Sequence, residues 1–186
     1  MNQIPSSEDR RGGDAAAGVI DHFRKRAEGR GEERPYRRTA SGAWAASRPE
    51  YLFDFFKSVN LSGFRLFIDL GSGDGVAACV AGLFTRAIGI ESDRLLACEA
   101  QRAARALRLS GRVEFICANF LTQNIQKADC LYIYPDKPLE GLETVLEGWG
   151  GTLLVYGPHF PPKRFFLQKK LRRDMETLSL YSRSLK

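Results

Sequence analysis

The sequence predicts an α/β fold built on a parallel β-sheet with helices on both faces. Short apolar runs with β-strand character alternate with segments of helical spacing from residue 65 onward. Strands that alternate with helices are joined by crossovers, which place the strands in parallel and cover both faces of the sheet. A glycine-rich turn at residues 71–75 directly follows the first strand, a position at which open parallel sheets bind ligands.

The segments before that first strand are predicted from local signals. Residues 1–12 are polar, and we expect them to lack structure, whereas residues 15–27 have the spacing of a short amphipathic helix. The glycines and proline of residues 29–35 interrupt it. Pro49 fits the first turn of a second helix, which residues 60–63 end.

The remaining elements follow in regular order. The expected strands are residues 65–70, 87–90, 113–117, 130–134 and 151–156, and the expected helices are residues 76–84, 93–109 and 139–146. Residues 165–171 and 177–185 are predicted as an antiparallel pair of strands at the end of the sheet, with a helix over 164–174 as the competing prediction.

Length and composition fit one domain with a core. The chain has 186 residues, of which 44% are apolar, so global disorder is excluded. No apolar run is long enough to span a membrane, and the N-terminus lacks the apolar segment of a secretory signal. We divide the chain into a basic, partly disordered extension at residues 1–40 and one domain at residues 41–186.

The cysteines indicate a reducing compartment. Cys79, Cys98, Cys117 and Cys130 form no CxxC pair, and the two histidines are isolated. This pattern fits neither a zinc site nor a disulfide framework. We therefore expect buried reduced thiols, a cytoplasmic protein and no metal site.

The glycine turn and an acidic residue after the next strand predict a nucleotide-type ligand. Gly71, Gly73 and Gly75 remove side chains that would keep a ligand from the backbone and permit a positive φ. Glu91 ends the second strand, where a carboxylate can accept hydrogen bonds from both ribose hydroxyls. The structural alternatives are a tight turn for the glycines and a strand-end or cap-neighbour position for Glu91.

Charge then distinguishes between nucleotides. A dinucleotide fingerprint requires a third glycine at position 76, which is Val76, and no phosphate-binding P-loop string is present. Asp69 and Asp74 would repel a pyrophosphate, but they suit the ammonium and sulfonium groups of S-adenosylmethionine. The sequence therefore favours that cofactor over NAD or ATP.

Residues 67–75 (FIDLGSGDG) resemble motif I of the class I S-adenosylmethionine-dependent methyltransferases, and residues 89–93 (GIESD) resemble their acidic second motif. The resemblance covers roughly residues 49–157. It implies a Rossmann-like three-layer α/β/α sandwich with a mainly parallel seven-stranded sheet whose last strand is antiparallel, and it implies methyl transfer. The wording of motif I is also similar to a subgroup that contains protein-lysine methyltransferases.

The resemblance also implies the cofactor-binding residues. They surround the methionine part, the ribose and the adenine of S-adenosylmethionine in turn, and comprise Asp69, Gly71, Ser72, Gly73, Asp74, Gly75, Glu91, Asn119 and Phe120. Asn119 has a donor and an acceptor for an adenine edge, although it can equally cap a turn. Phe120 suits either the adenine face or the core.

The expected catalytic end follows the fourth strand. Residues 134–138 read YPDKP, which departs from the Asn/Asp-Pro-Pro-Tyr pattern of enzymes that methylate adenine or glutamine. Tyr134 can orient a nucleophile beside the sulfonium methyl, and Asp136 can act as a base or hold an ammonium. The alternative for Asp136 is a helix N-cap. Trp44, Ser47 and His159 are further candidate contacts.

Charge is concentrated near the two ends of the chain. Residues 24–38 hold seven Arg/Lys against three Glu, and residues 163–186 hold eight against two acidic residues. Solvated surface is one explanation, and a basic rim for nucleic acid or an acidic substrate is the other. The expected acceptor is a protein side chain, with RNA or a small molecule as alternatives. A non-catalytic S-adenosylmethionine-binding module and an NAD-dependent oxidoreductase are the competing functions.

Overall fold

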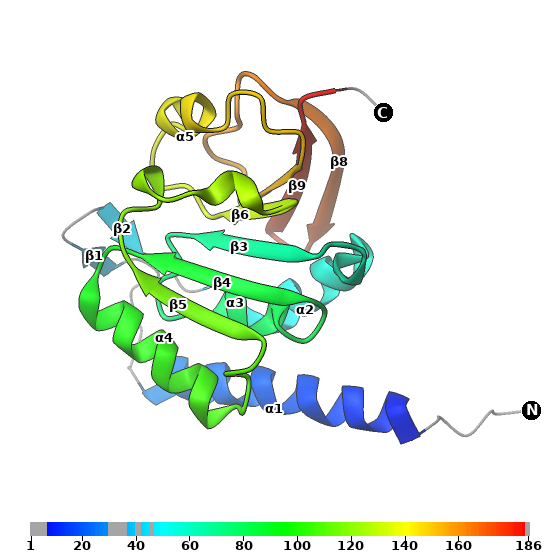
Figure 1. Cartoon of the computed structure of the whole chain (residues 1–186). Helices are drawn as coiled ribbons and strands as arrows, with labels where there is room; N and C mark the ends of the chain where they lie inside the picture. Colours follow the sequence, from blue (N-terminus) through cyan, green and yellow to red (C-terminus); the bar gives the residue numbers. More distant parts are fainter. Residues whose placement is uncertain (1–6, 30–36, 40–41, 45–46, 185–186) are drawn as a thin grey trace, which may run out of the picture.

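A computed structural model describes the backbone of residues 7–29, 37–39, 42–44 and 47–184, and the side chains of residues 13–29 and 47–184. Figure 1 shows a central twisted sheet with most of its helices on one side. None of the described helices is long and apolar enough to span a membrane.

The sheet has seven strands in the order β5-β4-β3-β6-β7-β9-β8. The first five pair in parallel, while β9 lies between β7 and β8 and is antiparallel to both. The strands are β3 (Leu66–Leu70), β4 (Arg86–Glu91), β5 (Val113–Cys117), β6 (Cys130–Ile133), β7 (Thr152–Tyr156), β8 (Phe166–Arg173) and β9 (Glu176–Ser182). The chain builds outward from β3 in both directions, so the order reverses between β3 and β6.

Four helices cover one face of this sheet. They are α1 (Ser7–Gly29), α2 (Pro49–Ser58), α3 (Val76–Ala81) and α4 (Arg94–Ala106). Their apolar faces join the same side of the strands in one core cluster, to which α1 contributes Val19 and Phe23 and α2 contributes Leu52, Phe55 and Phe56. Pro49 starts α2 without an amide donor, and Asp93 caps α4 by accepting from the amides of Leu95 and Leu96.

The opposite face is covered more thinly. Its helix α5 (Glu140–Val145) is short, and the rest of the cover consists of the 3-10 turns η2 (Phe120–Thr122) and η3 (Ile125–Lys127) and the loop after β7. Trp149 fixes this layer, because its indole Nε1 donates to the Ala128 carbonyl at 2.7 Å. The three-layer α/β/α architecture and the mainly parallel seven-stranded sheet are confirmed.

Most predicted elements are present, but two expectations were wrong. Helix α1 begins at Ser7, so the predicted lack of structure fails for residues 7–12, and residues 1–6 lie outside the described part. The antiparallel pair of strands predicted at the end of the sheet is confirmed as β8 and β9, and the competing helix over residues 164–174 is wrong. Cys98 and Cys117 are exposed, so only Cys79 and Cys130 are the expected buried free thiols. The hairpin of β1 (Arg37–Thr39) and β2 (Gly42–Trp44) was not predicted.

Candidate functional site

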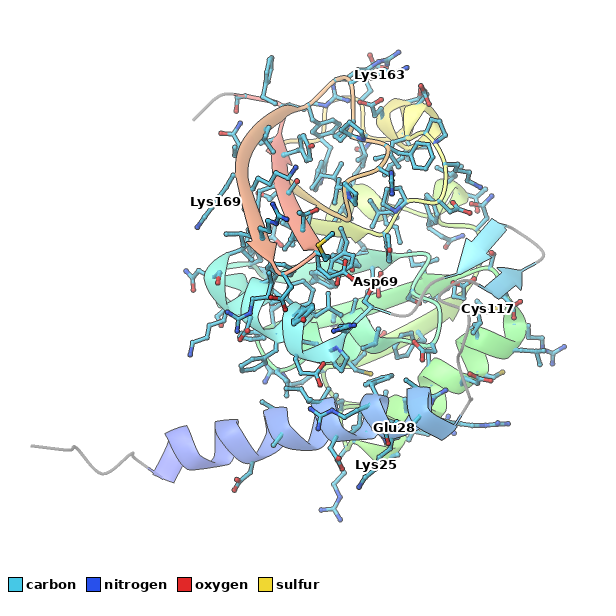
Figure 2. The ribbon with its side chains drawn as sticks, turned by 180° about the vertical axis from the view of Figure 1, so that it is seen from behind. Lys25, Glu28, Asp69, Cys117, Lys163 and Lys169 are labelled. Atoms are coloured by element: carbon cyan, nitrogen blue, oxygen red, sulfur yellow. The ribbon has the colours of Figure 1, made fainter. Side chains whose placement is uncertain are left out.

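A cavity of about 510 Å³ opens at the carboxyl ends of β3, β4 and β6, next to the point where the strand order reverses. Eight of the eleven predicted site residues line it: Asp69, Gly71, Ser72, Glu91, Asn119, Phe120, Tyr134 and Asp136. Figure 2 shows Asp69 in the interior of the molecule, between the sheet and the surrounding elements. The size of the cavity suits a nucleoside-type ligand, because small-molecule sites typically enclose about 300–1,000 Å³.

The glycine turn lies against the end of β4. Gly71, Gly73 and Gly75 have φ values of 75°, 54° and 90°, in the left-handed region that favours glycine. The amides of Gly71 and Ser72 both donate to the Ile90 carbonyl, at 2.9 and 3.0 Å. The backbone of the turn is therefore held in place before any ligand binds.

Glu91 fastens this turn from the neighbouring strand. Its Oε2 accepts from the Gly73 amide at 2.8 Å, and its Oε1 accepts from the Asp93 amide at 2.8 Å. The side chain is 8% exposed and lines the cavity. Each carboxylate oxygen can accept a second hydrogen bond, so the structural role leaves capacity for a ligand's hydroxyl groups.

Asp69 is a buried acid without a full set of partners. It is 2% exposed, and its Oδ2 has no hydrogen-bond partner in the described part of the chain. Burial raises the pKa of this carboxyl group well above its ordinary value, and the nearby carboxylate of Glu91 raises the pKa further. The Ser72 hydroxyl beside the same cavity also lacks a partner. Buried polar groups without partners are uncommon, so both atoms are candidates for a ligand contact.

The next strand supplies the two residues expected at an adenine ring. Asn119 caps the η2 turn, because its Oδ1 accepts from the Leu121 amide at 3.0 Å. The turn-capping alternative is therefore correct for that oxygen, although Asn119 also lines the cavity. Phe120 lines the cavity and also packs against the second core cluster.

The segment after β6 brings the predicted catalytic pair to the wall of the cavity. Tyr134 is half-buried, and its ring lies 5.0 Å from that of Tyr156 in an edge-to-face contact. Asp136 is exposed. It does not cap α5, because the N-cap position of that helix is Leu139, without a side-chain hydrogen bond. The N-cap alternative for Asp136 is therefore wrong.

Other predicted residues lie outside this cavity. Gly73 and Gly75 shape the turn without lining it, and Asp74 borders a second cavity of about 640 Å³ between α1 and α2. Ser47 lines both cavities. His159 is exposed and packs its ring near Phe160, away from the cavity. The side chain of Trp44 lies outside the described residues.

Sequence reasoning missed most of the apolar wall. It consists of residues from α3, α4 and the segment that follows β6, chiefly Val76, Ala77, Leu96, Ile133, Pro135, Leu139 and Leu142. Apolar residues of this kind occur throughout any core and carry no local signal. Only their place near the switch point of the sheet could have identified them.

Neither the protein-family models nor the curated proteins give a match to the sequence. Solved structures do match. An RNA methyltransferase from Salinibacter ruber in complex with S-adenosyl-L-homocysteine has a TM-score of 0.64 and 21% identity, covering 74% of this chain and 93% of that one. A methyltransferase from Geobacter sulfurreducens has a TM-score of 0.63 and 17% identity, covering 98% of this chain and all of that one.

A third similar structure is the mitomycin 7-O-methyltransferase MmcR, with a TM-score of 0.60 and 16% identity. It covers 73% of this chain, which spans only 54% of that protein. At these identities the likeness establishes the fold, and the chain has the fold of these methyltransferase structures.

Proposed function

We propose that this chain is a class I S-adenosylmethionine-dependent methyltransferase. The observation that carries the proposal is the buried Oδ2 of Asp69, which has no hydrogen-bond partner among the described residues and lies at the cavity beside the glycine turn. An ammonium group would supply the missing hydrogen bond and the missing positive charge together. S-adenosylmethionine carries such a group together with a sulfonium.

The electrostatics of the site support this cofactor over a phosphate-bearing nucleotide. Asp69, Asp74 and Glu91 are all buried around the turn and its two cavities. Three carboxyl groups in a low-dielectric site attract a cationic ligand and repel pyrophosphate. Val76 lines the cavity where a dinucleotide fold would use a third glycine.

Different residues of the chain would bind different parts of S-adenosylmethionine. Asp69, Gly71 and Ser72 would hold the methionine part, with Gly73, Asp74 and Gly75 shaping the turn. Glu91 would accept from the ribose hydroxyls, and Asn119 and Phe120 would contact the adenine. Tyr134 and Asp136, which line the same cavity, would orient the acceptor.

The bound cofactor would supply an activated methyl group. Methyl transfer then requires alignment of the nucleophile with that methyl and the exclusion of water. The apolar wall formed by residues such as Val76, Leu96 and Leu142 excludes water. Tyr134 would fix the nucleophile by a hydrogen bond, and Asp136 would accept its proton.

Two classes of macromolecular acceptor follow from the sequence, a protein lysine and an RNA, and a small molecule is the third candidate. The lysine rests on the wording of the glycine turn alone. The names of two similar structures refer to RNA and to mitomycin. Four free cysteines support placement of the protein in the cytoplasm.

The test of the cofactor is calorimetric titration of S-adenosylmethionine into the wild-type protein and into Glu91→Ala. The substitution should weaken binding by roughly 1.5–3 kcal/mol, because a charged acceptor of hydrogen bonds is lost. Glu114→Ala, at an exposed β5 carboxylate, is the matched control and should leave the affinity unchanged. Tight binding of NADH, without binding of S-adenosylmethionine, would refute the proposal.

Catalysis is tested separately, by incubating the protein with methyl-labelled S-adenosylmethionine and either a proteome or an RNA extract. We expect label in one macromolecular fraction. A protein that binds the cofactor yet transfers no label to either extract, or to small molecules, would be a binding module rather than an enzyme.

A further inference from the structure

Strand β8 forms one edge of the sheet and carries only positive charge. It pairs with β9 on one side and with no other strand of the part of the chain that the structure describes. Four of its eight residues are cationic and none is acidic. Figure 1 shows it as the outermost strand of the terminal hairpin, and Figure 2 shows Lys169 projecting from it.

The cations of β8 alternate between the two faces of the sheet. Lys169 and Arg173 lie on the side of α2, where Lys169 Nζ donates to the Ser58 carbonyl at 3.5 Å and Arg173 pairs with Asp54. Lys170 and Arg172 point to the opposite side, because their register partners in β9 are Ser179 and Thr177. Neither makes an ion pair with any carboxylate of the described residues.

Protection of the sheet edge explains only part of the composition of β8. Charged side chains on an edge strand, lysines above all, prevent its pairing with another sheet, so edge protection accounts for part of the charge of β8 but not for its exposed apolar side chains. Here the charge has one sign, and two large apolar side chains, Phe166 and Leu167, are each 50% exposed on the same strand. A basic strand with an exposed aromatic ring is the surface on which single-stranded nucleic acid binds, by phosphate contacts and base stacking.

The position of β8 connects this surface to the cavity. Strands β7 and β8 are both antiparallel to β9, so their carboxyl ends lie at the same edge of the sheet as the cavity. The turn after β8 is tied to α2, because the Tyr51 hydroxyl donates to Asp174 at 2.5 Å. Next to this turn lies Tyr156, whose ring contacts Tyr134 at the cavity.

We propose that a basic strip on β8, made of Phe166, Lys169, Lys170, Arg172 and Arg173, binds single-stranded RNA and leads a nucleotide toward the cavity. RNA is the partner because its recognition normally targets loops and ends with unpaired bases, which suit an exposed ring beside cations. The delivery of an acceptor nucleotide rests on the proposed function, whereas RNA binding by the strip does not.

The experiment measures fluorescence anisotropy of a labelled 12-nucleotide oligouridylate with the full chain between 50 and 200 mM salt. Four phosphate contacts on a single strand predict a slope of about −3 in log K against log salt, or roughly a 50-fold loss over that range. The double variant Lys170→Glu/Arg172→Glu should bind at least about tenfold more weakly with a shallower slope. Phe166→Ala should weaken binding at least about fivefold through lost stacking.

A matched control reverses the charge of two exposed arginines on α4, which packs near the opposite edge of the sheet, against β4 and β5. Arg102→Glu/Arg105→Glu, on α4, changes the net charge equally and should alter RNA affinity less than about twofold. Equal losses in both double variants would overturn the strip, as would unchanged affinity in Lys170→Glu/Arg172→Glu. Stronger competition by phosphatidylserine vesicles or by a polyglutamate peptide than by unlabelled RNA would also overturn it.

Calorimetry with S-adenosylmethionine distinguishes a failure of RNA binding by the strip from a failure of the proposed methyltransferase function. Both double variants should bind the cofactor as the wild type does, because neither touches the cavity. Loss of RNA binding with intact cofactor binding in Lys170→Glu/Arg172→Glu supports the strip. A wild-type protein that binds RNA through β8 but no cofactor would refute the function and leave the strip standing.

Discussion

The carboxyl group of Asp69 is buried with one oxygen unpaired, close to two further acidic side chains. Its pKa is raised well above the ordinary value, chiefly by burial and then by the charge of Glu91. Such a group lowers the stability of the ligand-free protein. The carboxyl group of Asp69 lies where a cationic ligand would supply the missing hydrogen bond and charge, as expected when a binding site is formed at the cost of stability.

Asp69→Asn should therefore stabilise the ligand-free protein and weaken cofactor binding at least about tenfold. The folded-state pKa of Asp69 is raised, so its contribution to stability is fully present below its unfolded pKa and is lost as the pH rises through the folded pKa. The gain in Tm of the variant should thus be larger at pH 8 than at pH 5. Each kcal/mol of added unfolding free energy should raise Tm by roughly 2–4 °C. Thermal melts at both pH values, with calorimetry, measure the two effects.

Glu114→Gln serves as the control for this prediction, because Glu114 is an exposed carboxylate in a surface ion pair. This substitution should change Tm by no more than about 1–2 °C and should leave the cofactor affinity unchanged. If Asp69→Asn instead lowered Tm at pH 8 and left the cofactor affinity intact, Asp69 would be a structural acid with a satisfied charge.

Among the elements, the glycine turn depends on a residue that no motif contains. A Cβ at Gly75 would lie 2.7 Å from Phe115 Cζ, and one at Gly89 would lie 2.4 Å from the same ring and 2.7 Å from Ser72 Oγ. A Cβ at Gly71 meets nothing within 4 Å, although its φ of 75° is unfavourable for other residues. Phe115 of β5 thus packs against the turn and the end of β4 from outside the motif.

Gly89→Ala and Gly71→Ala should separate folding from binding. Gly89→Ala should destabilise by roughly 1–3 kcal/mol, because overpacking shifts Phe115 and the turn. Gly71→Ala should cost only about 1 kcal/mol, yet reduce cofactor affinity by at least about tenfold, because its methyl group enters or borders the cavity. Urea denaturation measures the loss of stability, and calorimetry measures the loss of cofactor affinity. A larger loss of stability in Gly71→Ala, or a larger loss of affinity in Gly89→Ala, would contradict this prediction.

How well the sequence predicted an element depended on whether its signal was local. Pro49 and Asp93 start their helices through backbone chemistry, which a sequence displays. The extents of α3 and α5 were overestimated, since α3 ends at Ala81 and α5 spans Glu140–Val145. The cap at Asp136 failed because Pro138 disfavours helical geometry at the residue before it, so α5 starts only at Glu140, a local signal that the prediction overlooked. The positions of the site residues followed from topology, whereas their partners did not.

At the scale of the whole molecule, the helices are unevenly distributed over the two faces of the sheet. Four of the five α-helices pack on one face, and short turns cover much of the other. The apolar face of residues 15–27 was visible in the sequence, but it did not show that α1 packs on α2 and α3. The boundary placed at residues 40 and 41 stays a prediction. The contacts of α1 show that this helix contributes to the core.

Phe23→Ala tests whether α1 folds as part of the domain. Phe23 is 5% exposed and belongs to the core cluster that includes Leu52 and Val76, so truncation should cost about 3–5 kcal/mol in one cooperative transition. The control is Lys25→Ala on the exposed side of α1, where a surface ion pair with Asp21 contributes less than about 1 kcal/mol. Urea unfolding followed by circular dichroism measures both variants. An early, separate loss of helix with an unchanged main transition would make α1 an appendage, and the covering of this face of the sheet would then begin with α2.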